Sequence, residues 1–131
     1  MGVERYLSAA TLRLSLAQRL VRRLCPYCRK KTTLTAEQAR ALKKPEAEGM
    51  AAFEAGACVY CAGRGYRGRV GLFEMLPIDE EFSRKIIQGG EEADFREMMK
   101  QRGMASLLDD AMEKVREGTT SLHEVLAAAA I

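Results

Sequence analysis

The four cysteines of this 131-residue chain lie in two pairs with identical spacing. The pairs are Cys25-Pro26-Tyr27-Cys28 and Cys58-Val59-Tyr60-Cys61. A Cys-x-x-Cys turn brings two thiolates to one metal ion, and a second turn completes a tetrahedron with no open position for water or substrate. The spacing therefore predicts a structural metal site, with zinc as the first candidate metal and four ligands: Cys25, Cys28, Cys58 and Cys61.

Other chemistry for the cysteines fits the sequence less well. Two disulfides would suit a small secreted protein, but residues 1–10 include Glu4 and Arg5 and do not form a signal peptide. A thioredoxin-like redox pair would open a helix in a βαβ unit and would leave the second pair unexplained. An iron centre stays open, because sequence alone does not distinguish iron from zinc at four thiolates.

Basic residues flank both cysteine pairs. They are Arg19, Arg22, Arg23, Arg29, Lys30 and Lys31 around the first pair and Arg64, Arg67 and Arg69 after the second. If both pairs bind one metal, these cations gather into one patch. We favour a solvated rim that offsets the formal charge of a metal held by four thiolates. Contact with nucleotide phosphate, acidic lipid or an acidic partner surface stays open.

Two other sequence features do not support an active site. Gly63-x-Gly65-x-x-Gly68 matches a dinucleotide-binding fingerprint, but it follows a cysteine pair and leads into an expected strand rather than a helix. His123 is the only histidine and has no catalytic constellation near it in sequence. The chain also has no G-x-x-x-x-G-K-[ST] loop for nucleotide phosphates. No catalytic residue is therefore predicted.

Composition indicates a small domain. The chain has room for one modest core and a metal-held lobe. A net charge of +3 and an aromatic content of 6% do not favour nucleic acid. No apolar run approaches the roughly 20 residues of a membrane-spanning helix, so we expect a soluble, cytoplasmic chain.

Two strands are expected to bracket the cysteines. Leu12, Leu14 and Leu16 alternate with other residues and predict a strand with one buried face, preceded by the end of a helix at residues 3–10. Residues 69–76 predict a second strand, closed by Pro77. If these strands pair antiparallel, residues 21–68 form an excursion that the thiolates pin shut.

The remaining elements are predicted helices. A capping box at Thr35-x-x-Gln38 begins a short helix that Pro45 terminates. Asp79 caps a helix that stops at Gly89, and a second helix runs to Gly103. A third ends at Gly118, after which Ser121-x-x-Glu124 caps the last. The inward residues are expected to be Phe82, Ile86, Ile87, Phe95, Met98, Met99, Leu107, Leu108, Ala111, Met112, Val115, Leu122, Val125 and Leu126.

Several segments in order resemble the C-terminal part of the secretion ATPases, the family that powers type II secretion and type IV pilus assembly. They are residues 16–28, the run from Cys58 through Gly63 and Gly65 to Glu74, residues 103–107, residues 114–120 and residues 124–126. The resemblance covers nearly the whole chain. Arg64 departs from it, because a small polar residue is expected there.

The resemblance implies an α+β, mainly helical fold. Residues 1–24 would end a RecA-like ATPase core with a helix and an edge strand, and residues 25–68 would form an inserted tetracysteine zinc lobe. Residues 69–77 would return to the sheet, and residues 78–131 would form a C-terminal helical subdomain.

It also implies a function. The parent protein would be a hexameric ATPase that uses ATP and Mg, while this part alone lacks the Walker motifs and would be inactive. Arg19 could lie near the nucleotide of the parent. Partners would be neighbouring subunits of a homohexamer and inner-membrane platform proteins, with peripheral membrane contact and a cytoplasmic location.

Two functions of other classes remain as alternatives. A free-standing zinc ribbon would bind nucleic acid through the basic residues, with an affinity that falls steeply as salt rises. A chaperone-like zinc module, suggested by Cys58-x-x-Cys61-x-Gly63-x-Gly65, would bind unfolded polypeptide.

Overall fold

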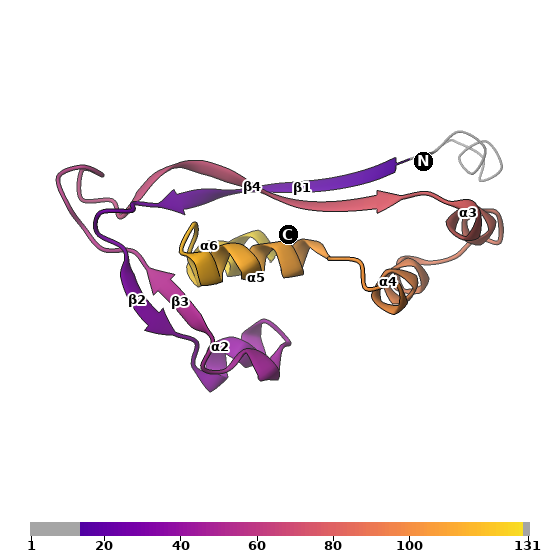
Figure 1. Ribbon diagram of the computed structural model, residues 1–131, viewed down its shortest axis with the longest axis horizontal. Coiled ribbons are helices and arrows are strands. Elements are labelled where there is room, and N and C mark those ends of the chain that lie inside the picture. Colours follow the sequence, from indigo (N-terminus) through magenta and orange to yellow (C-terminus); the bar gives the residue numbers. More distant parts are fainter. Residues whose placement is uncertain (1–13, 130–131) are drawn as a thin grey trace. The chain divides into compact units, whose positions relative to one another are not determined.

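The computed structural model describes residues 14–129. The helix expected at residues 3–10 and the inward Leu12 lie outside these described residues. Strands β1 (Leu14–Leu24) and β4 (Tyr66–Pro77) pair, and their arrows in Figure 1 point in opposite directions. The predicted antiparallel strand pair is therefore present, with the cysteine-bearing excursion between its strands.

Strand β4 begins three residues before the predicted start at Arg69. The backbone N–H of Cys25 donates to the carbonyl of Gly65 at 2.9 Å, so hydrogen bonding between the two chain segments continues to the cysteine turns. The glycine pattern before Arg69 predicts tight turns, and Gly63, Gly65 and Gly68 do have left-handed backbone, as does Ala62. Tyr66 and Arg67 are in the strand.

The expected buried face of the first strand is wrong at Leu16, which is 56% exposed. Among residues 16–24 of β1, the buried ones are instead Val21 and Leu24, near its end. The connection after helix α5 (Leu107–Glu117) covers that end, because Leu24 N–H donates to Thr119 and the Thr120 hydroxyl donates to the carbonyl of Arg22. The alternating leucines predict a strand, but they do not indicate which segment of the chain covers it.

The excursion contains a hairpin that the sequence did not predict. Strands β2 (Lys30–Thr33) and β3 (Ala51–Glu54) pair antiparallel with Lys30 opposite Glu54. Helix α2 (Ala36–Ala41) starts at the predicted capping box, with both reciprocal hydrogen bonds of Thr35 and Gln38 present.

The predicted end of this helix at Pro45 is wrong. The helix ends at Ala41, and Lys43 then takes a left-handed φ of 58°. Pro45 begins the 3-10 helix η1 (Pro45–Ala47), because a missing N–H costs nothing in a first helical turn.

The four C-terminal helices confirm most of the predicted starts and stops. Helices α3 (Glu80–Ile87), α4 (Glu92–Gln101) and α5 are each followed by a glycine with positive φ. Asp79 accepts from the N–H of Phe82 at 3.0 Å, and Ser121 accepts from that of Glu124 at 3.3 Å at the start of α6 (Leu122–Ala129). Ile87, the last residue of α3, was expected to face inward but is 52% exposed, so this prediction is wrong.

The described chain forms two compact units, and the fold class is α+β. One unit contains residues 14–17 and 73–107, with Phe82 and Met99 buried. The other contains residues 18–72 and 108–129, with the cysteines and most buried residues. No helix within the described range is long and apolar enough to cross a membrane.

Candidate metal centre

The four cysteine sulfurs converge in the second unit. All four Sγ atoms lie within 4.8 Å of one another. The Sγ atoms are 3.6 Å apart for Cys25 and Cys58, 3.7 Å for Cys28 and Cys61, and 3.6 Å for Cys58 and Cys61. Four thiolates bound at about 2.3 Å to one tetrahedral zinc ion would be about 3.8 Å apart. The cysteines are free thiols and are close enough to bind one metal ion.

Tight backbone turns aim the second pair of sulfurs inward. The N–H of Gly63 donates to the carbonyl of Cys58 at 2.8 Å, and Ala62 and Gly63 both have positive φ. The N–H of Gly65 then donates to the sulfur of Cys61 at 3.2 Å. Gly63 and Gly65 permit the turn, as the sequence predicted, and Ala62 adopts left-handed backbone without being a glycine. The backbone amide of Gly65 gives the sulfur a donor that favours its thiolate form.

Two glycines let the cysteine turns approach closely. A Cβ at Gly56 would lie 2.1 Å from the carbonyl oxygen of Cys28, and a Cβ at Gly65 would lie 2.6 Å from that of Gly56. Sequence reasoning missed the role of Gly56. Its position two residues before Cys58 was the available signal, but the clash with Cys28 exists only in three dimensions.

The thiols differ in electrostatic environment. Burial, and after it hydrogen bonds with the other three cysteines, raise the pKa of the Cys28 thiol to about 12. Burial opposes ionisation of Cys61, but hydrogen bonds from Gly65, Cys58 and Cys28 together outweigh burial and lower the pKa of this thiol to about 6. The largest of these contributions comes from the backbone N–H of Gly65. A bound dication would favour the thiolate at every ligand, so metal binding should release protons.

The predicted basic patch separates into different contacts. Arg29 donates to the carbonyl of Gly118 at the end of α5. Arg22 pairs with Glu124 at 3.0 Å. Four arginines line one open pocket beside Cys61: Arg22, Arg64, Arg67 and Arg69.

Arg19 does not line this pocket. Its side chain is exposed, and its guanidinium donates to the carbonyl of the adjacent Gln18 at 2.9 Å. The expected proximity of Arg19 to a nucleotide stays a prediction.

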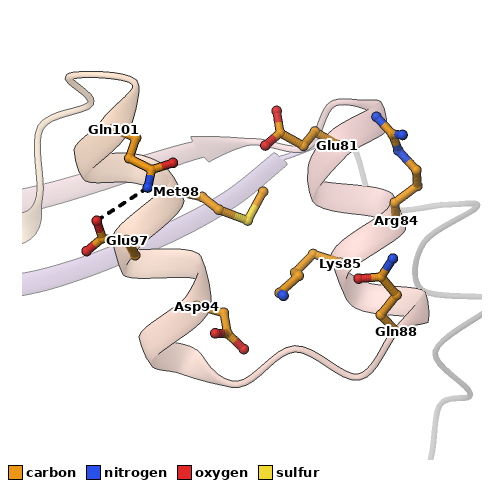
Figure 2. A pocket seen from close by; sticks show the side chains of 8 residues that line it. All are labelled: Glu81, Arg84, Lys85, Gln88, Asp94, Glu97, Met98 and Gln101. Carbon is orange, nitrogen blue, oxygen red and sulfur yellow. Dashed lines mark hydrogen bonds between the residues drawn. The ribbon is translucent and has the colours of Figure 1, made fainter.

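A second pocket lies in the other unit, between α3 and α4 (Figure 2). It has a volume of about 530 Å³, and it is lined by both charge signs, including Glu81, Lys85 and Asp94. Gln101 donates to Glu97 across one turn of α4. The pocket contains no cysteine, histidine or hydroxyl nucleophile. The residues that line this pocket therefore do not indicate a catalytic site.

Comparison with known proteins gives the relationships of the chain. The family model for "Type II/IV secretion system protein" matches residues 1–127. A type IV pilus assembly ATPase PilB of Thermus thermophilus is 37% identical over 97% of this chain and 14% of its own length. A PilB of Myxococcus xanthus is 39% identical over 96% of the chain and 23% of its own length. The type II secretion system ATPase E of Vibrio cholerae is 38% identical over 96% of the chain and 25% of its own length.

Proposed function

Since the chain belongs to the type II/IV secretion system protein family, we propose that it is the zinc-stapled C-terminal portion of a hexameric ATPase. The parent would power protein secretion through a type II system or assembly of a type IV pilus. The chain spans at most a quarter of the three compared relatives, which include named ATPases of both systems. The choice between the two systems therefore remains part of the proposal.

The sulfur cluster is the observation that carries the proposed zinc role. The four sulfurs lie within 4.8 Å of one another and bring together residues 33 positions apart, such as Cys25 and Cys58. In zinc-finger peptides the metal supplies about 10 to 16 kcal/mol, which is enough to order a lobe with a small apolar core. We infer that zinc holds the excursion closed as a rigid arm.

ATP and Mg would be bound by other parts of the parent, in a RecA-like core whose sheet β1 and β4 extend. Exposed apolar side chains support this assignment. Leu16, Phe73 and Met75 are each more than two-fifths exposed. Such residues on a strand pair are typical of a face that another layer covers.

The proposed role of the arm is mechanical. It would pass movement of the ATPase core to a neighbouring subunit of a homohexamer or to inner-membrane platform proteins. The parent would then be cytoplasmic and peripherally attached to the membrane. This part would hydrolyse no ATP alone and would not bind nucleic acid.

The first test measures zinc and motor activity. We expect one zinc per chain by metal mass spectrometry, and loss of zinc in the Cys58→Ser, Cys61→Ser double variant. In the complete motor the same double variant should lose secretion or pilus assembly, while ATP binding by the core is kept. Val59→Ser is the matched control for metal content, because Val59 lies in the same turn and is 98% exposed.

Two results would contradict the proposal. Native protein that contains no metal would show that no metal ion holds the excursion closed. Unchanged transport by a complete motor whose double variant lacks zinc would show that the arm is dispensable.

A further inference from the structure

An open pocket of about 470 Å³ lies next to the metal centre, within the second unit. Cys61 forms part of its wall. Four of the residues that line it are arginines, and none is acidic: Arg22, Arg64, Arg67 and Arg69. The pocket therefore concentrates positive charge that the overall charge of +3 does not reveal.

Two of the guanidinium groups are held in place by tyrosines. The guanidinium carbon of Arg22 lies 4.2 Å from the ring centroid of Tyr66, and that of Arg67 lies 4.2 Å from the centroid of Tyr60. Arg67 also donates to the carbonyl of Tyr60 at 3.2 Å. Planar guanidinium donors that are already oriented lose less entropy when they bind an oxyanion.

The charges of the other two pocket arginines, Arg64 and Arg69, are not neutralised by an ion pair among the described residues. Both of these residues are exposed. Glu124 partly neutralises Arg22. The pocket thus offers free guanidinium donors beside oriented ones.

The negative charge of a zinc centre with four thiolates is too small to account for the positive charge of all four arginines. A zinc ion bound by four thiolates carries a formal charge of minus two. Even with Glu124 added, the negative charge at this site is smaller than that of the four guanidinium groups. Some positive charge remains for a ligand.

We propose that this pocket binds a phosphate group. Arginine recognises phosphate through bidentate, charge-assisted hydrogen bonds, and four guanidinium groups around one pocket suit the oxygens of such a group. The phosphate is carried either by a free anion or by the headgroup of a lipid.

Calorimetric titration of the zinc-loaded 131-residue chain with inorganic phosphate at low ionic strength tests the proposal. We expect saturable binding that weakens as salt rises. In the Arg64→Gln, Arg69→Gln double variant the affinity should fall roughly tenfold for each arginine. The control is Arg40→Gln, Arg84→Gln, which removes the same charge from α2 and α3 outside the pocket and should bind almost as well as the unaltered chain.

Sedimentation with vesicles distinguishes the two sources of phosphate. Binding of free phosphate without co-sedimentation identifies a free anion. Co-sedimentation with phosphatidic acid vesicles but not with phosphatidylcholine vesicles, lost in the pocket variant, identifies a lipid headgroup. The proposal is overturned if neither ligand binds, or if pocket and control variants lose binding equally. The zinc content of both variants is measured alongside, and loss of zinc from the pocket variant without any phosphate binding by the unaltered chain would identify the arginines as counter-ions of the metal centre.

Discussion

Glu124 joins helix α6 to strand β1 through a single carboxylate. It accepts from the backbone N–H of Arg22 at 2.6 Å and from the Arg22 guanidinium at 3.0 Å. The same guanidinium stacks on Tyr66, whose hydroxyl lies 2.7 Å from the Ser121 hydroxyl. Burial raises the pKa of the Glu124 carboxyl, but the bonds from Arg22 outweigh it, so the net pKa is below its usual value.

This pKa shift predicts a pH dependence of stability. A carboxyl with a lowered folded pKa stabilises the protein above its unfolded pKa, and this contribution is lost as pH falls through the folded pKa. The Glu124→Gln variant should therefore lose about 1 kcal/mol of unfolding free energy at neutral pH, and less at acidic pH. Denaturant unfolding across this pH range provides the measurement.

Glu113→Gln is the matched control for this change. Glu113 pairs with Arg116 three residues along α5, and both side chains are half exposed, so the expected loss is small. An identical pH profile for Glu124→Gln and the unaltered chain would show that the carboxylate does not stabilise the fold.

At the scale of elements, Arg29 connects the first cysteine turn to α5 and β3. Its guanidinium donates to the carbonyl of Gly118 at 2.7 Å and lies 4.7 Å from the ring centroid of Phe53. A cation at a helix C-terminus also interacts favourably with the helix dipole. A Cβ at Gly118 would lie 2.6 Å from this guanidinium, so the helix-ending glycine also makes room for the contact.

Removing the Arg29 guanidinium should weaken the C-terminal turn of α5. In Arg29→Met the apolar stem is kept but the charged donor is lost, and we expect about 1 kcal/mol lower unfolding free energy. Hydrogen exchange should increase at residues 114–119. Lys30→Met, an exposed neighbour in β2, is the control. Equal exchange in the two variants would argue against a link between these elements.

At the scale of the whole molecule, the two units have separate cores. In the unit without cysteines, Phe82 and Phe95 stack with ring centroids 6.3 Å apart, and Arg102 lies over Phe82 at 4.4 Å. The other unit buries Cys25 and Cys61 beside its apolar residues. Its order should therefore depend on the metal.

Chelation of the metal should affect the two units differently. We expect residues 25–68 to lose hydrogen-exchange protection. In zinc-finger peptides the binding of zinc contributes about 10 to 16 kcal/mol of folding free energy, and this contribution is lost on chelation. Helices α3 and α4 should keep their protection. Exchange mass spectrometry before and after chelation, with zinc added back as the control, measures both. Equal loss in both units would show that they unfold together.

Local signals in the sequence predicted most of the elements. The Thr35 and Asp79 caps and the glycines after α3, α4 and α5 were identified because a cap or a left-handed glycine acts within a few residues. The pairing of β2 with β3 was missed because each strand has only four residues, and α2 and η1 separate the two strands along the chain. This pairing depends on contacts that no local pattern records.

The sequence by itself determined which four cysteines make up the candidate metal site, because two Cys-x-x-Cys turns restrict which thiols can approach one ion, and the structure brings these four together. Only the tertiary structure decided which arginines meet in one pocket and which, like Arg29, serve a helix end. It also decided that Leu16 is exposed and that Gly56 must lack a side chain. Spacing constrains neighbours along the chain, whereas these outcomes depend on which distant segments approach one another.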